Sequence, residues 1–442
     1  MASDFRRRHA RIWRLSAPII LSGISVPLLG AVDTGVVGRL SDPAYIGGVA
    51  LGAMIFDFVF WGFGFLRMGT TGLAAQADGA GDAAERNAVL SRALLLGAAL
   101  GLLILLLQAP VGWLAFALLN GSEAVETQAR LYYSIRIWSA PATLANYALL
   151  GWLLARQRTD LVLAVELALN LVNILLDLWF VLGLGWGVAG VAAASVIAEL
   201  VALGLALVIR HRLGHRLDWR RERARILDRA RLMALMRVNF DILVRTLSLI
   251  AALALFTATG ARMGDLPLAG NAILMNFFLL LSYGLDGFAH TAQILVGTAI
   301  GARDRAAYRR AVGDTTLWAA GIAVAGAVGF ALAGPSLVRL YSVNPEVQAA
   351  ALAYLPWMVA IPLIAVWCFQ FDGVYIGATR TAEMRNGMLI SLAADLLALW
   401  LFVPAWGNHG LWLSLTVFFA ARSLTLGLWL PRIGRSIAAA PG

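Results

Sequence analysis

Residues 13–38 read WRLSAPIILSGISVPLLGAVDTGVVG. This stretch is long and apolar enough to cross a bilayer, which takes about 20 mostly apolar residues in a helix. It nevertheless contains Asp33, and a carboxylate placed in hydrocarbon costs several kcal/mol. The stretch therefore predicts a membrane helix that carries an acid for a functional reason.

The composition of the whole chain agrees with a polytopic membrane protein. Of its 442 residues, 60% are hydrophobic and only 14% are charged, whereas about a quarter of a soluble domain is charged. All basic residues are arginine, so the lysine-containing GxxxxGK[ST] phosphate loop is absent, which argues against an ATP-driven pump acting alone. The net charge of +10 is better explained by loops facing lipid headgroups than by nucleic acid.

Apolar stretches long enough to span a bilayer recur along the chain without a long polar domain between them. They predict twelve membrane helices at approximately 12–37, 46–75, 90–119, 127–155, 161–183, 187–210, 231–261, 267–299, 307–333, 347–377, 384–404 and 408–430.

The arginines are concentrated in alternate loops. The N-terminus, the loops near residues 86, 156, 303 and 380, and the stretch 210–231 contain most of them, while the intervening loops contain few. Because arginine-rich loops stay in the cytoplasm, this bias predicts a multi-pass protein of the bacterial inner membrane with both termini cytoplasmic.

The second half of the chain repeats the first. GWLLARQRT at 151–159 matches GVYIGATRT at 373–381, and GAGD at 79–82 matches GARD at 301–304, both at the same offset along the chain. Two copies of six spans have the same orientation, which is a transporter architecture with an axis along the membrane normal. We therefore predict an all-α polytopic membrane protein with two six-helix lobes. The predicted domains are an N-terminal lobe (1–210), a cytoplasmic basic connection (211–230) and a C-terminal lobe (231–442).

The fifth predicted span contains the polar residues Asn170, Asn173 and Asp177. Their spacing of three and four residues places them on one helix face. Together with Asp33, Asn173 and Asp177 supply oxygens that suit a proton or a sodium ion. Two acids in a poorly hydrated place resist ionising together, so we expect the pair to hold and release a proton as one unit.

The second half carries a different set of charged residues. Asp241 and Arg245 are four residues apart, which is the spacing of an ion pair on a helix, and Asp286 is a candidate third member. Asp395 corresponds through the repeat to Asn173. We interpret these residues as a polar network of the second lobe.

No catalytic or metal-binding pattern accompanies these spans. The sequence contains no HExxH or GxSxG motif, and its single cysteine, Cys368, excludes an internal disulfide. We expect no cofactor beyond the coupling ion, and no enzymatic activity.

Several stretches together resemble one transporter family. AVDTGVVGRLSDPAYIGGVALG, WGFGFLRMGTTGLAAQADGAGD and NLVNILLDLWFV in the first half, with NFDILVRT, LDGFAHTAQ and GNHGLW in the second, resemble multidrug and toxic compound extrusion proteins. The closer likeness is to the DNA-damage-inducible-F subfamily, and it covers essentially the whole chain.

This resemblance implies antiport of drugs against protons or sodium by alternating access. It assigns the coupling site to Asp33, Asn173 and Asp177, with a hydroxyl from Ser195 and a tyrosine at Tyr132. Asn146 is the best match for a further polar residue, although its spacing to the fifth span differs by about one turn.

The expected function is therefore export of amphipathic organic cations by a monomer in the lipid bilayer. One alternative is a flippase for lipid-linked precursors, which would need a strongly basic cavity, while the spans offer mainly Arg67 and Arg245. The other alternative is a membrane-embedded enzyme, against which the absence of a His- or Cys-based catalytic grouping argues.

Overall fold

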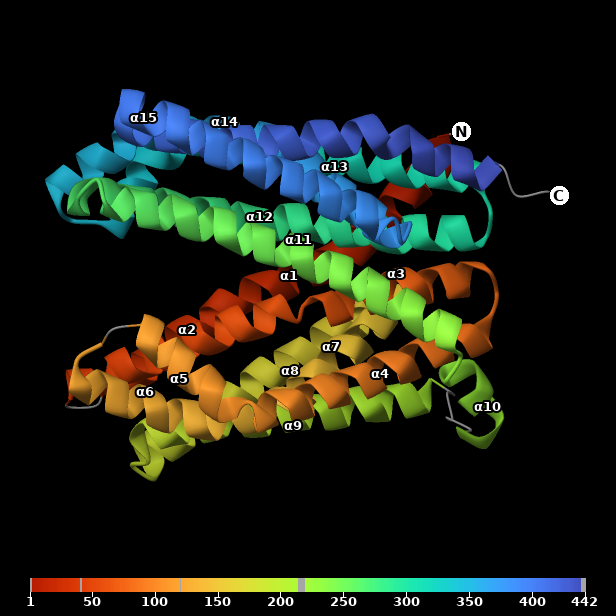
Figure 1. Ribbon diagram of the computed structural model, residues 1–442, viewed down its shortest axis with the longest axis horizontal. Helices are drawn as coiled ribbons and strands as arrows, with labels where there is room; N and C mark the ends of the chain where they lie inside the picture. The colour runs from red at the N-terminus through yellow and green to blue at the C-terminus, as the bar shows by residue number, and fades with distance from the viewer. Residues whose placement is uncertain (1, 40–41, 120, 214–218, 439–442) are drawn as a thin grey trace. The chain divides into compact units, whose positions relative to one another are not determined.

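The structure is a computed structural model that describes residues 2–39, 42–119, 121–213 and 219–438. Every regular element within these ranges is a helix, as the sequence predicts (Figure 1). In chain order the elements are α1 (Ala2–Val37), α2 (Pro43–Gly62), α3 (Phe65–Gly79), α4 (Ala83–Leu106), α5 (Gln108–Leu118), α6 (Glu123–Arg136), η1 (Ile137–Ser139), α7 (Ala140–Ala155), α8 (Thr159–Asp177), η2 (Leu178–Gly183), α9 (Gly187–Arg212), α10 (Trp219–Ile226), α11 (Arg229–Ala261), α12 (Asp265–Gly301), α13 (Arg305–Tyr341), α14 (Pro345–Gly377) and α15 (Thr381–Ala438).

These helices supply the twelve predicted spans. Among the described residues, ten helical stretches are long and apolar enough to cross a membrane. One of them, α15, is two helices joined at Gly407, whose φ of 54° and ψ of −127° break the helix. A further span is the continuous run of α6, η1 and α7 from Glu123 to Ala155. The prediction of an all-α polytopic protein is therefore confirmed.

The repeat is visible in the backbone between the spans. Asp82 caps α4 by accepting from the Glu85 N–H (2.9 Å), and its counterpart in the repeat, Asp304, caps α13 by accepting from the Ala307 N–H (2.8 Å). Positive φ angles recur at corresponding positions. They occur at Gly81 (73°) and Arg303 (55°), and at Gln157 (59°) and Thr379 (53°). The two halves thus share the turns as well as the number of spans.

The chain forms two compact units. One contains Met1–Ile20, Ala75–Gly81 and Arg237–Gly442, and the other contains Leu21–Ala74 and Asp82–Met236. The lobes predicted at 1–210 and 231–442 stay a prediction. The connection predicted at 211–230 includes residues 214–218, which lie outside the described residues.

The unit built mainly from α12, α13, α14 and α15 has an aromatic core. Trp412, Phe418 and Phe419 are fully or almost fully buried and pack with Met358 and Phe277. In Figure 1 these helices run alongside one another. The end of α3 also belongs to this unit, where Gly79 faces the backbone of Thr298 and Gly301 faces the backbone of Gln76. A Cβ atom at either glycine would overlap the facing carbonyl group, so only glycine permits this crossing.

The other unit brings α2 against α6, α4 against α7 and α8 against α9. Small residues make the α2–α6 approach close. A Cβ atom at Gly52 would lie 2.5 Å from the ring of Tyr132, and one at Gly47 would lie 2.8 Å from the side chain of Val125. This is the close packing that small residues permit between membrane helices. It also holds the Tyr132 ring in a fixed place, at 4% exposure.

Candidate functional site

The acids of α1 and α8 meet in one buried cluster, which we call the acidic cluster: Asp33, Asn173, Asp177 and Ser195. In the orientation that satisfies its neighbours, the Asn173 amide nitrogen donates to Asp177 Oδ2 (3.1 Å) and to Asp33 Oδ1 (3.3 Å). Its amide oxygen accepts from the backbone N–H and the hydroxyl of Ser195, both at 3.1 Å. One asparagine therefore links both acids to α9.

The two carboxyl groups meet at the Asn173 amide nitrogen and lie close enough to interact with each other. A hydrogen bond between two carboxyl groups needs a proton on one of them, because an ionised carboxylate only accepts. Asp177 is fully buried and Asn173 is 1% exposed, while Asp33 is half-buried. The arrangement can therefore share one proton between α1 and α8.

Tyr132 of α6 completes the surroundings of the acidic cluster. Its ring is 4% exposed and lies within electrostatic reach of both Asp33 and Asp177. The π-helical turn η2 begins directly after Asp177. Such turns inside α-helices frequently occur at functional sites.

Two other residues predicted from the first half lie near the acidic cluster but bind elsewhere. Asn170 donates to the Ser25 hydroxyl (2.8 Å) and so connects α8 to α1. Asn146 donates to Glu199 Oε2 (2.8 Å) and to its backbone oxygen (3.1 Å). Asn146 therefore belongs to a second polar group, one helical turn of α9 beyond Ser195.

Arg136 is the member of this second group that sequence reasoning missed. Its guanidinium lies 3.6 Å from Glu199 Oε1 and within electrostatic reach of Asp33 and Asp57. The sequence carries a signal for it, because an arginine follows YYSI within the predicted span 127–155. Arg67, the first-half span arginine named from the sequence, has its Nη1 atom 3.8 Å from Glu166 Oε1.

The prediction of an ion pair between Asp241 and Arg245 is wrong. Asp241 accepts from Arg385 (2.7 Å) and from the Thr381 hydroxyl (2.9 Å). Arg245 instead binds Asp372. Helical spacing of four residues permits a pair, but a partner on another helix that also satisfies the guanidinium competes with it.

Asp372 is the centre of a buried charged group that we call the arginine cluster: Arg245, Asp372 and Arg422. Both guanidinium groups bind the same carboxylate oxygen, Asp372 Oδ2. Asp372 is 5% exposed and Arg422 is 1% exposed. Sequence reasoning missed Arg422, although FFAARSLT places an arginine in the last span.

The predicted second-lobe network is therefore divided among three places. Asp286 lies within electrostatic reach of Arg245 and Arg422. Asp395 is buried near Ser414, whose hydroxyl donates to the Leu411 carbonyl oxygen (2.9 Å), and Asp241 binds Arg385 as described. Of these acids, Asp286 and Asp241 face arginines, whereas the first-half cluster brings two acids together.

Comparison with known sequences identifies the family. The sequence profile of the MatE family matches the chain twice, over residues 18–179 and 242–401. The two matches are displaced along the chain by nearly the same distance as the repeated motifs. The chain belongs to the MatE family. The resemblance to multidrug and toxic compound extrusion proteins is thereby confirmed, and MatE proteins are transporters rather than enzymes.

Curated relatives agree with this membership over nearly the full length. The chain is 42% identical to the DNA damage-inducible protein F of Escherichia coli, over 95% of this chain and 91% of that protein. It is 25% identical to a probable multidrug resistance protein NorM of Synechococcus sp., over 95% of this chain and 92% of that protein. The bacterial relatives and the apolar helices indicate a multi-pass inner membrane protein.

Solved structures show the same fold. A crystal structure described as MATE in the bent conformation matches with a TM-score of 0.88 at 20% identity, covering 97% of this chain and 96% of that chain. The MatE fold thus accounts for the twelve spans and their repeat. The roles of individual residues follow from the site itself.

Proposed function

We propose that this MatE transporter is a secondary active antiporter that exports amphipathic organic cations in exchange for protons. The observation that carries the proposal is the acidic cluster, in which Asn173 donates to both Asp33 and Asp177. One proton lowers the charge of this buried pair of acids from −2 to −1, and an organic cation can offset the same charge. Two ligands that compete for one charge are coupled, and the coupling is reciprocal by linkage.

The change between the two helix arrangements of the transport cycle follows from the same competition between proton and organic cation. With a proton bound between the acids, a shared hydrogen bond holds their carboxyl groups, and with them α1 and α8, together. Loss of the proton leaves two negative charges side by side and repels α1 from α8. Protonation therefore changes the balance between two helix arrangements, as a local electrostatic switch requires.

Sodium is the second candidate for the coupling ion. Carboxylate, amide and hydroxyl oxygens are ligands for hard cations, and the cluster contains all three types. We choose the proton because the two carboxyl groups lie side by side, where one shared proton removes the repulsion between two ionised acids.

The flippase alternative receives less support. Such a transporter needs unpaired basic groups for a pyrophosphate, whereas four arginines within the spans face carboxylates. Arg67 lies against Glu166, Arg136 against Glu199, and Arg245 and Arg422 against Asp372.

Transport in proteoliposomes tests the coupling ion. We expect a pH gradient, imposed without sodium, to drive accumulation of a fluorescent organic cation such as ethidium, and a sodium gradient at equal pH to drive none. The matched control is vesicles without protein. Accumulation driven by sodium alone would overturn the choice of the proton.

We further propose that both termini and the basic connection are cytoplasmic and that the chain acts as a monomer. The structure supports a common side for two arginine-rich segments, since α10 packs against α4 and Arg225 lies 3.1 Å from Asp82 Oδ1. Single cysteines at exposed positions test the orientation after Cys368 is replaced by alanine. An impermeant maleimide added to intact cells should label Val343→Cys and not Arg223→Cys, and the opposite pattern would reverse the topology.

A further inference from the structure

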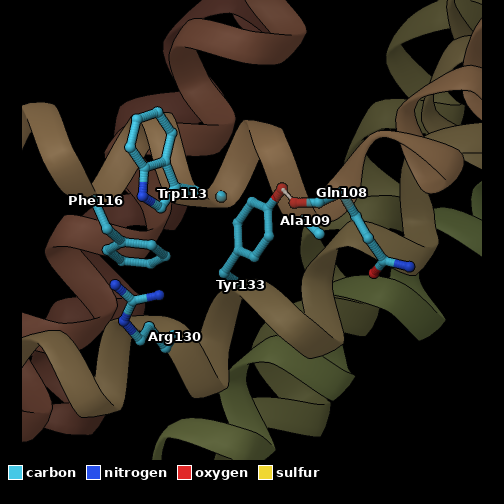
Figure 2. A pocket seen from close by; sticks show the side chains of 7 residues that line it. Gln108, Ala109, Trp113, Phe116, Arg130 and Tyr133 are labelled. Carbon is cyan, nitrogen blue, oxygen red and sulfur yellow. Dashed lines mark hydrogen bonds between the residues drawn. The ribbon is translucent and has the colours of Figure 1, made fainter.

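A cavity of about 300 Å³ lies between α5 and α6, and no residue of the acidic cluster lines it (Figure 2). Its walls are the aromatic side chains of Trp113, Phe116 and Tyr133 together with Arg130. The Tyr133 hydroxyl donates to the Gln108 carbonyl oxygen (2.8 Å), which fixes the ring against α5. The volume is at the lower end of the range typical for small-ligand sites.

Arg130 places a cation beside the aromatic wall. Arg130 lies beside the Phe116 ring in Figure 2, and its guanidinium carbon is 4.4 Å from the ring centre. Its Nε and Nη2 atoms donate to Glu126 Oε1 at 2.9 and 2.5 Å. The side chains of Arg130 and Glu126 are 54% and 31% exposed. Arg130 therefore lines the cavity, and its acidic partner Glu126 lies one helical turn before it on α6.

Exposed apolar side chains lie on α5 and at the adjoining end of α4. Trp113 is 70% exposed, Leu118 is 72% exposed and Leu106 is 71% exposed. In a membrane-spanning helix such side chains contact acyl chains, and tryptophan is enriched at the level of the headgroups. Arg130 is about two turns, or roughly 10 Å along the helix axis, from the start of α6 at Glu123. This depth lets an arginine extend its guanidinium into the headgroup layer.

We propose that this cavity binds one phospholipid with a zwitterionic, primary-amine headgroup, that is, a phosphatidylethanolamine. The phosphate lies against Arg130, since a guanidinium binds phosphate oxygens with charge-assisted hydrogen bonds. The ammonium lies against Glu126, and the upper part of an acyl chain lies on Trp113, Phe116 and Tyr133. The arrangement favours phosphatidylethanolamine over phosphatidylglycerol, which has no cation for Glu126. It also favours it over phosphatidylcholine, whose quaternary ammonium has no N–H to donate.

Native mass spectrometry of the full chain tests this site. The protein is purified in detergent, depleted of lipid and titrated with short-chain phosphatidylethanolamine, phosphatidylcholine or phosphatidylglycerol. We expect one phosphatidylethanolamine to bind more tightly than either other lipid. Arg130→Gln should weaken its binding roughly tenfold, as expected for loss of a charged hydrogen bond. Glu126→Gln should remove the preference for phosphatidylethanolamine over phosphatidylcholine.

Arg262→Gln is the matched control, because Arg262 is an exposed arginine outside the cavity. It should bind phosphatidylethanolamine as the wild type does. Thermal unfolding of each variant verifies that it is folded, and a misfolded Arg130→Gln is replaced by Arg130→Lys, which keeps the charge and should retain most binding. Equal affinity of the wild type and a folded Arg130→Gln would overturn the proposal, as would tighter binding of phosphatidylglycerol.

Discussion

Replacement of Asp33 by asparagine is expected to abolish gradient-driven efflux while leaving an inserted, folded protein. The amide has nearly the shape of the carboxyl group and can still meet the Asn173 and Asp177 side chains, so α1 retains its packing. It cannot take up and release a proton, so the cluster loses the competition between proton and cation. Ethidium transport driven by a pH gradient in proteoliposomes should fall to the level of vesicles without protein.

Asp57→Asn is the control for this variant, because Asp57 is an acid of the same unit that lies outside the acidic cluster. It should keep gradient-driven transport at equal protein content. Asp177→Asn should behave as Asp33→Asn does, since the two acids share the site. Wild-type transport by Asp33→Asn would show that this acid does not couple the ion to the substrate.

Replacement of Asp372 by asparagine is expected to cause the largest loss of stability. Arg245 and Arg422 bind the same oxygen of Asp372, and all three side chains are buried. Removing one partner of a buried charged group leaves uncompensated charge, which costs about 3–5 kcal/mol. Thermal unfolding in detergent should show a markedly lower midpoint, and the yield of inserted protein should fall.

Two variants separate the loss of charge balance from a general packing defect. The triple variant Asp372→Leu/Arg245→Met/Arg422→Met should recover much of the lost stability, because replacing a whole buried ion group with apolar residues is often nearly neutral. Asp286→Asn, which removes a more distant acid, should have a small effect. An unchanged unfolding midpoint for Asp372→Asn would mean that the arginine cluster is not a charge-balanced unit.

The twelve spans and their repeat were predictable because they depend on local properties. Apolar length fixes a span, and identical turn chemistry at Asp82 and Asp304 shows that the second half copies the first. The exact helix ends were less predictable. The break at Gly407 lies between the predicted spans 384–404 and 408–430, whereas the short helix η1 inside the predicted span 127–155 was not predicted.

The acidic cluster was predicted in part. The spacing of Asn173 and Asp177 puts both on one face of α8, and in the structure their side chains meet. That both residues lie near Asp33 was inferred from the family resemblance and from the free-energy cost of placing a carboxylate in hydrocarbon without a function. The hydrogen-bond roles of Asn173 could not be predicted, because they depend on where α9 places Ser195.

The charged groups of the second half could not be paired from the sequence. Arg245 has Asp241 one turn away, but it binds Asp372, which is 127 residues later. Arg136 and Glu199 are likewise distant in sequence. Pairing between helices depends on which faces meet, and spacing along one helix carries no information about that.

Proton release on substrate binding tests the central claim most directly. The purified wild type in a weakly buffered detergent solution is mixed with ethidium near neutral pH while the proton concentration is followed. We predict that binding of one cation releases close to one proton and that Asp33→Asn releases none. Tight binding of ethidium by the wild type without any proton release would contradict competition at the acidic cluster.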